Sequence, residues 1–168
     1  MLLGIDPGIT KANPCGIAIF AEGRLVQWYL IIPFPLSGGP GARAMAIIER
    51  LDYLREAKGI TEIACEEIVP WPGHRNLEGL VVLAREIKAL AERRKLPINF
   101  YTPQQWHGRL KAPVWQAAII QEWGLPEDTS VHILAAVGIG AYHLAREAKA
   151  IKGTVMPHKK RPDLVIGE

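Results

Sequence analysis

The sequence predicts an α/β fold in which a mixed five-stranded sheet carries helices on both faces. Three strand-like runs come first, at residues 1–6, from Gly16 and from Arg24. Glu22 and Gly23, between the second run and the third, predict the tight turn of an antiparallel hairpin. After residue 41, runs with helical spacing alternate with two further strand-like runs. The expected order is therefore β-β-β-α-β-α-β-α-α, with the sheet covered on both sides.

The later elements follow from the spacing of apolar residues and from breaks at glycine and proline. The glycine-rich segment 37–41 predicts a loop. We expect a helix over 42–57, a strand over 60–70, a loop over 71–76, a helix over 77–94, a strand over 98–103, and helices over 114–124 and about 129–149. In the first of these helices, helical intervals separate Met45, Ile48, Leu51 and Leu54. In the second, the apolar face is made by Leu80, Leu83, Ile87 and Leu90.

Length and composition predict a single domain over residues 1–150, followed by a basic tail over 151–168. The net charge of +3 is compatible with nucleic acid and also with many ordinary enzymes. Cys15 and Cys65 lie in apolar runs without C-x-x-C spacing, so we expect reduced core residues. No run resembles a leader or a membrane span, which predicts a cytoplasmic protein without a membrane partner.

Asp6 is unusual because it ends an apolar strand, directly before Pro7 and Gly8. Such an Asp often caps a turn, but a carboxylate at a strand end can also hold a metal ion at a fixed place. A second acid pair, Glu66 and Glu67, ends the fourth predicted strand. Because strand side chains alternate, only one of the two glutamates can face the same side as Asp6.

The predicted order, a three-stranded meander followed by βα units, is the layout of the ribonuclease H-like fold, in which the first and fourth strands are neighbours. Asp6 and one of the two glutamates would then converge at one point of the sheet. Two carboxylates held close together repel each other unless a divalent cation lies between them.

At this point the sequence resembles the RuvC-type Holliday-junction resolvases. The resemblance is carried by LLGIDPGIT with GIAIF after it, ACEEIVP about sixty residues later, YTPQQW, and a helix near residue 132, and it spans roughly residues 1–145. It implies a metal-dependent endonuclease that cleaves four-way DNA junctions as a homodimer, with two Mg²⁺ or Mn²⁺ ions per site.

The resemblance also implies site residues. Asp6 and Glu66 would be metal ligands, with Glu67 facing away, and His132 with position 135 would complete the site from the last helix. The family carries D-x-x-D or H-x-x-D there, whereas this chain has Ala135 at the second position. Residues three apart share one helical face, so the spacing is retained while the carboxylate is absent.

Three explanations of Ala135 remain open. The register can be shifted, with Asp128 one turn before His132 taking the role, although Asp128 lies where the N-cap of the helix is expected. The natural protein can have lost catalysis. The aspartate can also have been replaced by alanine to silence the enzyme while keeping its fold, which is the explanation we favour.

Candidate DNA contacts lie close to these acids in the sequence. In the loop WPGHRN, Trp71 can stack on bases and His74 and Arg75 can contact phosphates, although Trp71 can equally pack against the prolines beside it. Lys111 matches a basic residue that the family directs at DNA, and Lys11 follows the first strand. The basic tail is a further candidate for phosphate contacts.

Two other functions remain possible from the sequence. The motif GIDPG also resembles the first phosphate loop of the actin and sugar-kinase ATPases, but the chain is short for their two domains and has no second glycine-rich motif. A junction-binding protein without catalysis is favoured if Ala135 is natural.

Overall fold

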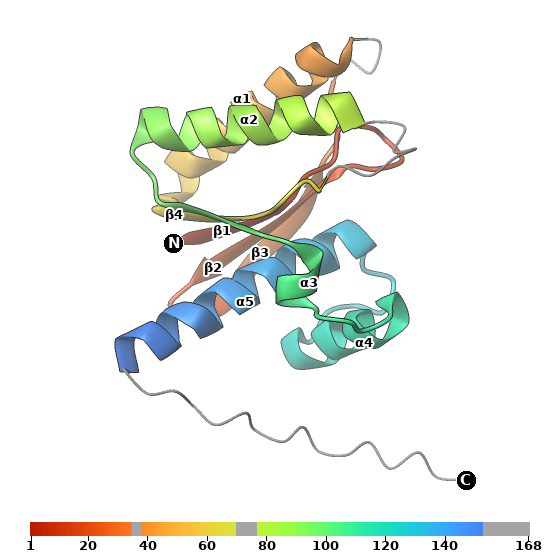
Figure 1. The fold of residues 1–168 in the computed structure, drawn as a ribbon, viewed down its shortest axis with the longest axis vertical. Coiled ribbons are helices and arrows are strands. Elements are labelled where there is room, and N and C mark those ends of the chain that lie inside the picture. Colours follow the sequence, from red (N-terminus) through yellow and green to blue (C-terminus); the bar gives the residue numbers. More distant parts are fainter. Residues whose placement is uncertain (35–37, 70–76, 153–168) are drawn as a thin grey trace, which may run out of the picture.

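A computed structural model describes residues 1–34, 38–69 and 77–152. The chain forms one five-stranded sheet with the strand order β3-β2-β1-β4-β5 (Figure 1). The strands are β1 (Leu2–Asp6), β2 (Cys15–Ala21), β3 (Arg24–Ile31), β4 (Glu62–Glu66) and β5 (Ile98–Tyr101). β1, β2 and β3 are antiparallel neighbours, whereas β1 with β4 and β4 with β5 run parallel. The predicted mixed sheet, with the first and fourth strands adjacent, is confirmed.

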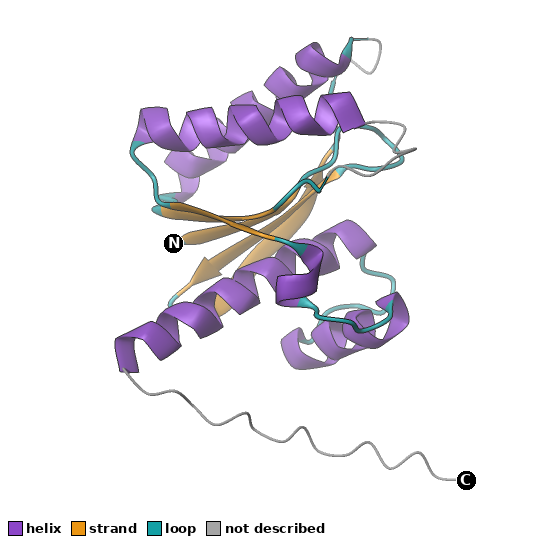
Figure 2. Cartoon of the chain, in the orientation of Figure 1, coloured by secondary structure: helices purple, strands orange, loops and turns teal. Residues whose placement is uncertain are grey.

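Helices cover both faces of this sheet, as Figure 2 shows. α1 (Pro40–Lys58) and α2 (Leu77–Arg94) lie on one side, and α4 (Ala112–Trp123) and α5 (Val131–Lys152) lie on the other together with the single turn α3 (Pro103–Trp106). Two hydrophobic clusters fill the layers: Ile5, Ile17 and Cys65 pack with α1 and α2, while Ala18, Phe20 and Ala64 pack with α4 and α5. Alternation along each strand therefore decides which layer each side chain enters.

Several boundaries differ from the sequence prediction for local reasons. α1 begins at Pro40, inside the segment predicted as a loop, because proline is well suited to the first helical turn. Of the apolar residues at helical intervals on α1, Ile48, Leu51 and Leu54 are buried, whereas Met45 is 43% exposed. The fourth strand ends at Glu66, four residues before the predicted end.

The hairpin and the buried cysteines agree with expectation. Glu22 and Gly23 both have positive φ angles, of 52° and 76°, which is the backbone of the type I′ turn that matches the twist of a hairpin. Cys15 and Cys65 are free and buried. The predicted basic tail lies almost wholly outside the described residues, and α5 continues to Lys152. No helix in the described part of the chain has the length and apolar character needed to cross a membrane.

Candidate active site

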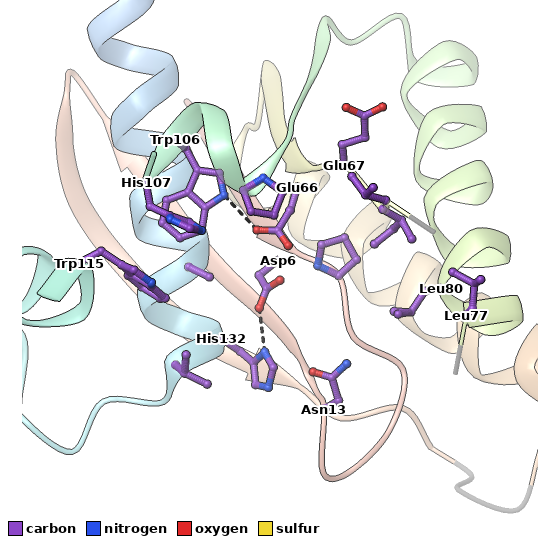
Figure 3. A pocket seen from close by; sticks show the side chains of 16 residues that line it. Asp6, Asn13, Glu66, Glu67, Leu77, Leu80, Trp106, His107, Trp115 and His132 are labelled. Carbon is purple, nitrogen blue, oxygen red and sulfur yellow. Dashed lines mark hydrogen bonds and ion pairs between the residues drawn. The ribbon is translucent and has the colours of Figure 1, made fainter. Parts of the chain in front are cut away.

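Two parallel strands bring Asp6 and Glu66 to the same edge of the sheet. Ile5 is the partner of Cys65 in the pairing of β1 with β4, so the two acids occupy the next position on each strand. Ile5 and Cys65 point into the layer of α1 and α2. Asp6 and Glu66 therefore point to the other face, towards α5, and Figure 3 shows them turned towards one another.

α5 crosses this face at very close range because two glycines of the sheet lie beneath it. A Cβ atom on Gly4 would collide with the backbone oxygen of Ala136, and a Cβ atom on Gly16 would collide with the backbone of His132. Only hydrogen atoms therefore separate the strand backbone from the helix at these two points. This contact places the first turns of α5, which carry His132 and Ala135, directly beside the end of β1.

His132 contacts Asp6 directly. The Nδ1 atom of His132 lies 2.7 Å from Oδ2 of Asp6, and both side chains are largely buried. When Asp6 is ionised it can only accept, so Nδ1 carries the proton and donates it to the carboxylate. The second imidazole nitrogen, Nε2, is then left available for another partner.

Glu66 is held by a tryptophan from the next connection. The Nε1–H group of Trp106 donates a hydrogen bond to Oε2 of Glu66, with 3.0 Å between the two heavy atoms. Trp106 is the last residue of α3, a single turn whose N-cap Thr102 and residue Gln105 exchange reciprocal hydrogen bonds. This capping box fixes the turn and with it the direction of the indole.

Burial raises the pKa of both carboxyl groups, and the charge of Asp6 adds to the rise at Glu66. Loss of hydration raises the pKa of Asp6 above its usual value, and the hydrogen bond and charge of His132 act against that rise. Burial first, and then the charge of Asp6, raise the pKa of Glu66 to about 7, while Trp106 and His132 act in the opposite direction. Without a cation, both carboxyl groups are therefore protonated more readily than ordinary ones.

A cavity of about 350 Å³ opens over the two acids. Its walls are mostly apolar, and Figure 3 shows the side chains of Asp6, Glu66 and His132 close to one another among them. The lining residues are Asp6, Pro7, Asn13, Glu66, Glu67, Ile68, Val69, Leu77, Leu80, Pro103, Trp106, His107, Trp115, Val131, His132 and Ala135. Position 135 thus contributes a methyl group at the place where the sequence pattern expects a carboxylate.

Known proteins share this architecture. No family model matches the chain. The crossover junction endodeoxyribonuclease RuvC of Frankia casuarinae is 25% identical over 108 residues, which cover 62% of this chain and 61% of the relative. RuvC of Frankia alni is 27% identical over 109 residues, covering 62% of this chain and 53% of that protein. The chain thus matches less than two thirds of the length of these curated relatives.

Solved structures agree over a longer part of the chain. The structure of Thermus thermophilus RuvC in complex with a Holliday junction substrate superimposes with a TM-score of 0.70 at 21% identity and covers 91% of this chain and 96% of that one. The fold is that of the RuvC-type resolvases. The yeast mitochondrial Holliday junction resolvase Ydc2 is more distant, with a TM-score of 0.51 and 15% identity over 90% of this chain and 83% of that one. The predicted ribonuclease H-like fold is confirmed.

On this RuvC-type fold the predicted site residues separate into two groups. Asp6, Glu66, His132 and Ala135 line one cavity. Glu67 follows the end of β4, is exposed, and points away from Asp6 at the rim of that cavity (Figure 3). Asp128 is not the N-cap of α5, which begins only at Val131; it lies in an exposed turn and does not line the cavity. The alternative register based on Asp128 therefore has no geometric support.

Of the predicted DNA contacts, only the two lysines belong to the described residues, and they lie outside the cavity. Lys11 and Lys111 are exposed, and neither lines the cavity. Lys11 belongs to the loop between β1 and β2, and Lys111 is the N-cap residue of α4. Trp71, His74 and Arg75 lie outside the described residues.

The donors in the cavity suit a divalent ion only in part. RuvC-type resolvases depend on divalent metal ions in general. Among residues 1–34, 38–69 and 77–152, no cluster of three or more His, Cys, Asp or Glu side chains is arranged to hold a metal. Mg²⁺, however, commonly binds one or two carboxylates and takes its other ligands from water and substrate phosphate. Asp6 and Glu66 fit one such ion, whereas a second ion lacks the carboxylate expected at position 135.

Sequence reasoning missed three residues that shape this site. Trp106 was not singled out, although T-x-x-Q before it is a capping-box pattern that signals a helical turn. Gly4 and Gly16 were also missed, because a glycine within a strand indicates a close approach without saying what approaches.

Proposed function

We propose that this chain binds four-way DNA junctions and that its cavity is built for metal-dependent hydrolysis of a phosphodiester bond. The observation that carries the proposal is the convergence of Asp6, Glu66 and His132 from two strand ends and a covering helix on one cavity. The fold supports it, since the structure of Thermus thermophilus RuvC that it matches contains a Holliday junction substrate. Its place of action would be the compartment that holds the DNA.

In this function the residues of the cavity would have different roles. Asp6 and Glu66 would hold Mg²⁺ or Mn²⁺ against a phosphate of the DNA, and His132 would orient Asp6 through its Nδ1–H group. The ion, when bound, would supply Lewis-acid stabilisation of charge at the phosphate and promote ionisation of an attacking water. The buried walls of the cavity would limit access of bulk water, which strengthens these electrostatic interactions.

Junction binding without cleavage is the second candidate, and Ala135 is the observation that favours it. Two-ion hydrolysis requires ligands for both metal positions, and this chain offers a methyl group in place of one carboxylate. Loss of about 4 kcal/mol of transition-state stabilisation slows a reaction roughly a thousandfold, while binding through phosphate contacts can remain. We therefore expect strong recognition of the junction and very slow cleavage.

We also propose a homodimer that presents two such cavities to opposed strands of the junction, since a two-fold dimer matches a two-fold junction. The support for it is the resemblance to the resolvases. Sedimentation of the free protein and of its complex, with the stoichiometry of chains per junction, tests it directly. One chain per junction at saturation would contradict it.

The main experiment compares a four-way junction with a linear duplex of the same arm sequence. Gel-shift titrations in EDTA should show tighter binding of the junction at equal salt. Long incubation in Mg²⁺ or Mn²⁺, followed by denaturing gels, measures any symmetric nicking. Equal affinity for junction and duplex would contradict the assignment of a junction-specific protein.

A further inference from the structure

The indole of Trp106 occupies one oxygen of a carboxylate that the proposed function needs. Its N–H group donates to Oε2 of Glu66 at 3.0 Å, and Glu66 is turned towards Asp6 (Figure 3). A carboxylate with one oxygen fixed has lost its main rotational freedom, and its other oxygen, Oε1, can bind an ion with little further ordering. We propose that Trp106 is the positioning residue for Glu66, an inference that rests on the metal-dependent function proposed above.

Three contacts hold the indole of Trp106 in place. The capping box of Thr102 and Gln105 fixes the turn that carries it. Its ring lies against α5 at Gly138, where an added Cβ atom would stand 2.7 Å from a ring carbon. Trp115 meets the ring edge to face, with 5.0 Å between the ring centroids. The donor atom is therefore fixed by two helices and a turn, as a positioning group requires.

The contact also joins the two halves of the site. Glu66 comes from β4, whereas Gly138 belongs to α5, one turn after Ala135 and two turns after His132. Trp106 touches both elements, so the indole sets the position of Glu66 relative to the helix that supplies the remaining groups. The hydrogen bond from Trp106 also acts to lower the pKa of Glu66, and so favours the ionised form that binds a cation.

Trp123 provides a matched control within the same molecule. It lies on α4 and packs edge to face against Phe20, with 5.4 Å between the ring centroids. Its Nε1 atom is buried and has no hydrogen-bond partner among the described residues. Trp123→Phe therefore removes an indole of the same size from the same layer without removing a contact to a carboxylate.

The first measurement needs no metal. In a ¹⁵N–¹H spectrum, the indole signal that is absent from Trp106→Phe belongs to Trp106, and the signal absent from Trp123→Phe belongs to Trp123. Glu66→Ala should shift the Trp106 signal and leave the Trp123 signal in place. An unmoved Trp106 signal would overturn the inference, because it would mean that the hydrogen bond is not present in solution.

The second measurement is the affinity for Mn²⁺, followed by the electron paramagnetic resonance signal of the free ion. Trp106→Phe should weaken binding by about ten-fold or more, the usual effect of losing a hydrogen bond to a metal ligand, while Trp123→Phe changes it less than about two-fold. Equal affinities of the two variants would overturn the positioning role alone. Absence of Mn²⁺ binding by the unmodified protein would overturn the metal site and this inference with it.

A milder pair of variants covers the case in which Trp106→Phe does not fold. Gln105 and its neighbour Gln104 are both exposed, but only Gln105 takes part in the capping box. Gln105→Ala should loosen the turn and weaken Mn²⁺ binding by a few-fold, whereas Gln104→Ala should leave it unchanged. Identical Mn²⁺ affinities of these two variants would again remove Trp106 from the role.

Discussion

His132 Nδ1 and Asp6 Oδ2 lie 2.7 Å apart, although 126 positions separate the two residues in the chain. The contact joins the first strand to the last helix. It keeps the face of α5 that carries His132 turned towards Asp6. Ala135 lies on the same helical face and lines the same cavity. Substitutions at these positions can therefore test the site directly.

Ala135→Asp should create a third carboxylate in the cavity. Without metal we expect the free energy of unfolding to fall by about 1–3 kcal/mol, because a buried charge is added beside Asp6 and Glu66. Mn²⁺ should reverse that loss, and nicking of a four-way junction should appear. Thermal melts in EDTA and in Mn²⁺, with a parallel cleavage assay, measure both effects.

Ala136→Asp is the matched control for that substitution. Ala136 is fully buried, lies next to Ala135 in sequence, and does not line the cavity. Its replacement should cost about 3 kcal/mol or more with or without metal, because the carboxylate has no partner there. If Ala135→Asp behaves in the same way, the expected role of position 135 is wrong.

Asp6→Asn should keep the fold and remove the response to metal. The substitution removes a buried negative charge next to Glu66, so we expect the melting temperature in EDTA to stay level or to rise. The increase that Mn²⁺ gives to the unmodified protein should disappear. Asp52→Asn, which changes an aspartate paired with Arg55 and Arg94 on the helical surface, should retain that increase. A full Mn²⁺ response in Asp6→Asn would contradict the assignment of Asp6.

The pKa of Glu66 predicts how stability depends on pH in the absence of metal. The folded-state pKa is raised to about 7 from an ordinary value of 4.5, so the folded protein holds this proton more tightly than the unfolded chain. The resulting stabilisation is complete below pH 4.5 and is lost as the pH rises through 7, by up to roughly 3 kcal/mol. Urea unfolding in EDTA across this range should show a flatter profile for Glu66→Gln. Parallel profiles would exclude the raised pKa.

Gly16→Ala should separate α5 from the sheet. The added methyl group would meet the backbone of His132, so the helix must move, and we expect a loss of about 1–3 kcal/mol with weaker Mn²⁺ binding. Gly41→Ala is the control, since a Cβ atom at that helical glycine would have no neighbouring atom within 4 Å. We expect it to be neutral or to gain up to about 1 kcal/mol. Unchanged stability and metal binding in Gly16→Ala would show that the close contact is not required.

Lys111 remains a predicted DNA contact that can be tested by salt dependence. If it neutralises one phosphate, Lys111→Ala should reduce the slope of log affinity against log salt by about one unit. Lys58→Ala serves as the control, because Lys58 ends α1 just before β4 begins, at the opposite end of that strand from Glu66. Equal slopes for both variants would remove Lys111 from the interface.

Much of the fold could be predicted because its elements have strong local signals. The helix predicted over 77–94 is the observed α2, whose buried residues repeat at helical spacing. The turn at Glu22 and Gly23 was equally clear. α3 was missed because its four residues are too few to show a period, and its first residue was assigned to the preceding strand instead.

Only part of the candidate site could be predicted from the sequence, for a different reason. Asp6 and the Glu66–Glu67 pair stand out as acids at the ends of apolar strands, and the strand order predicted that Asp6 and one of the glutamates converge. The choice of Glu66 came from the resemblance to the resolvases. The hydrogen bond between Trp106 and Glu66 joins residues 40 positions apart, and neither residue type indicates the other in a sequence. Contacts of this kind depend on tertiary packing, so no periodic pattern records them.

The two glycines beneath α5 have a consequence for recognising related chains. A relative that carries any larger residue at the position of Gly16 cannot hold its last helix at this depth, and so cannot bring residue 132 within hydrogen-bond distance of residue 6. The side chain at position 135 takes no part in these two backbone contacts. Glycine at positions 4 and 16 is therefore a criterion for the architecture of the site that is independent of the side chains that line it.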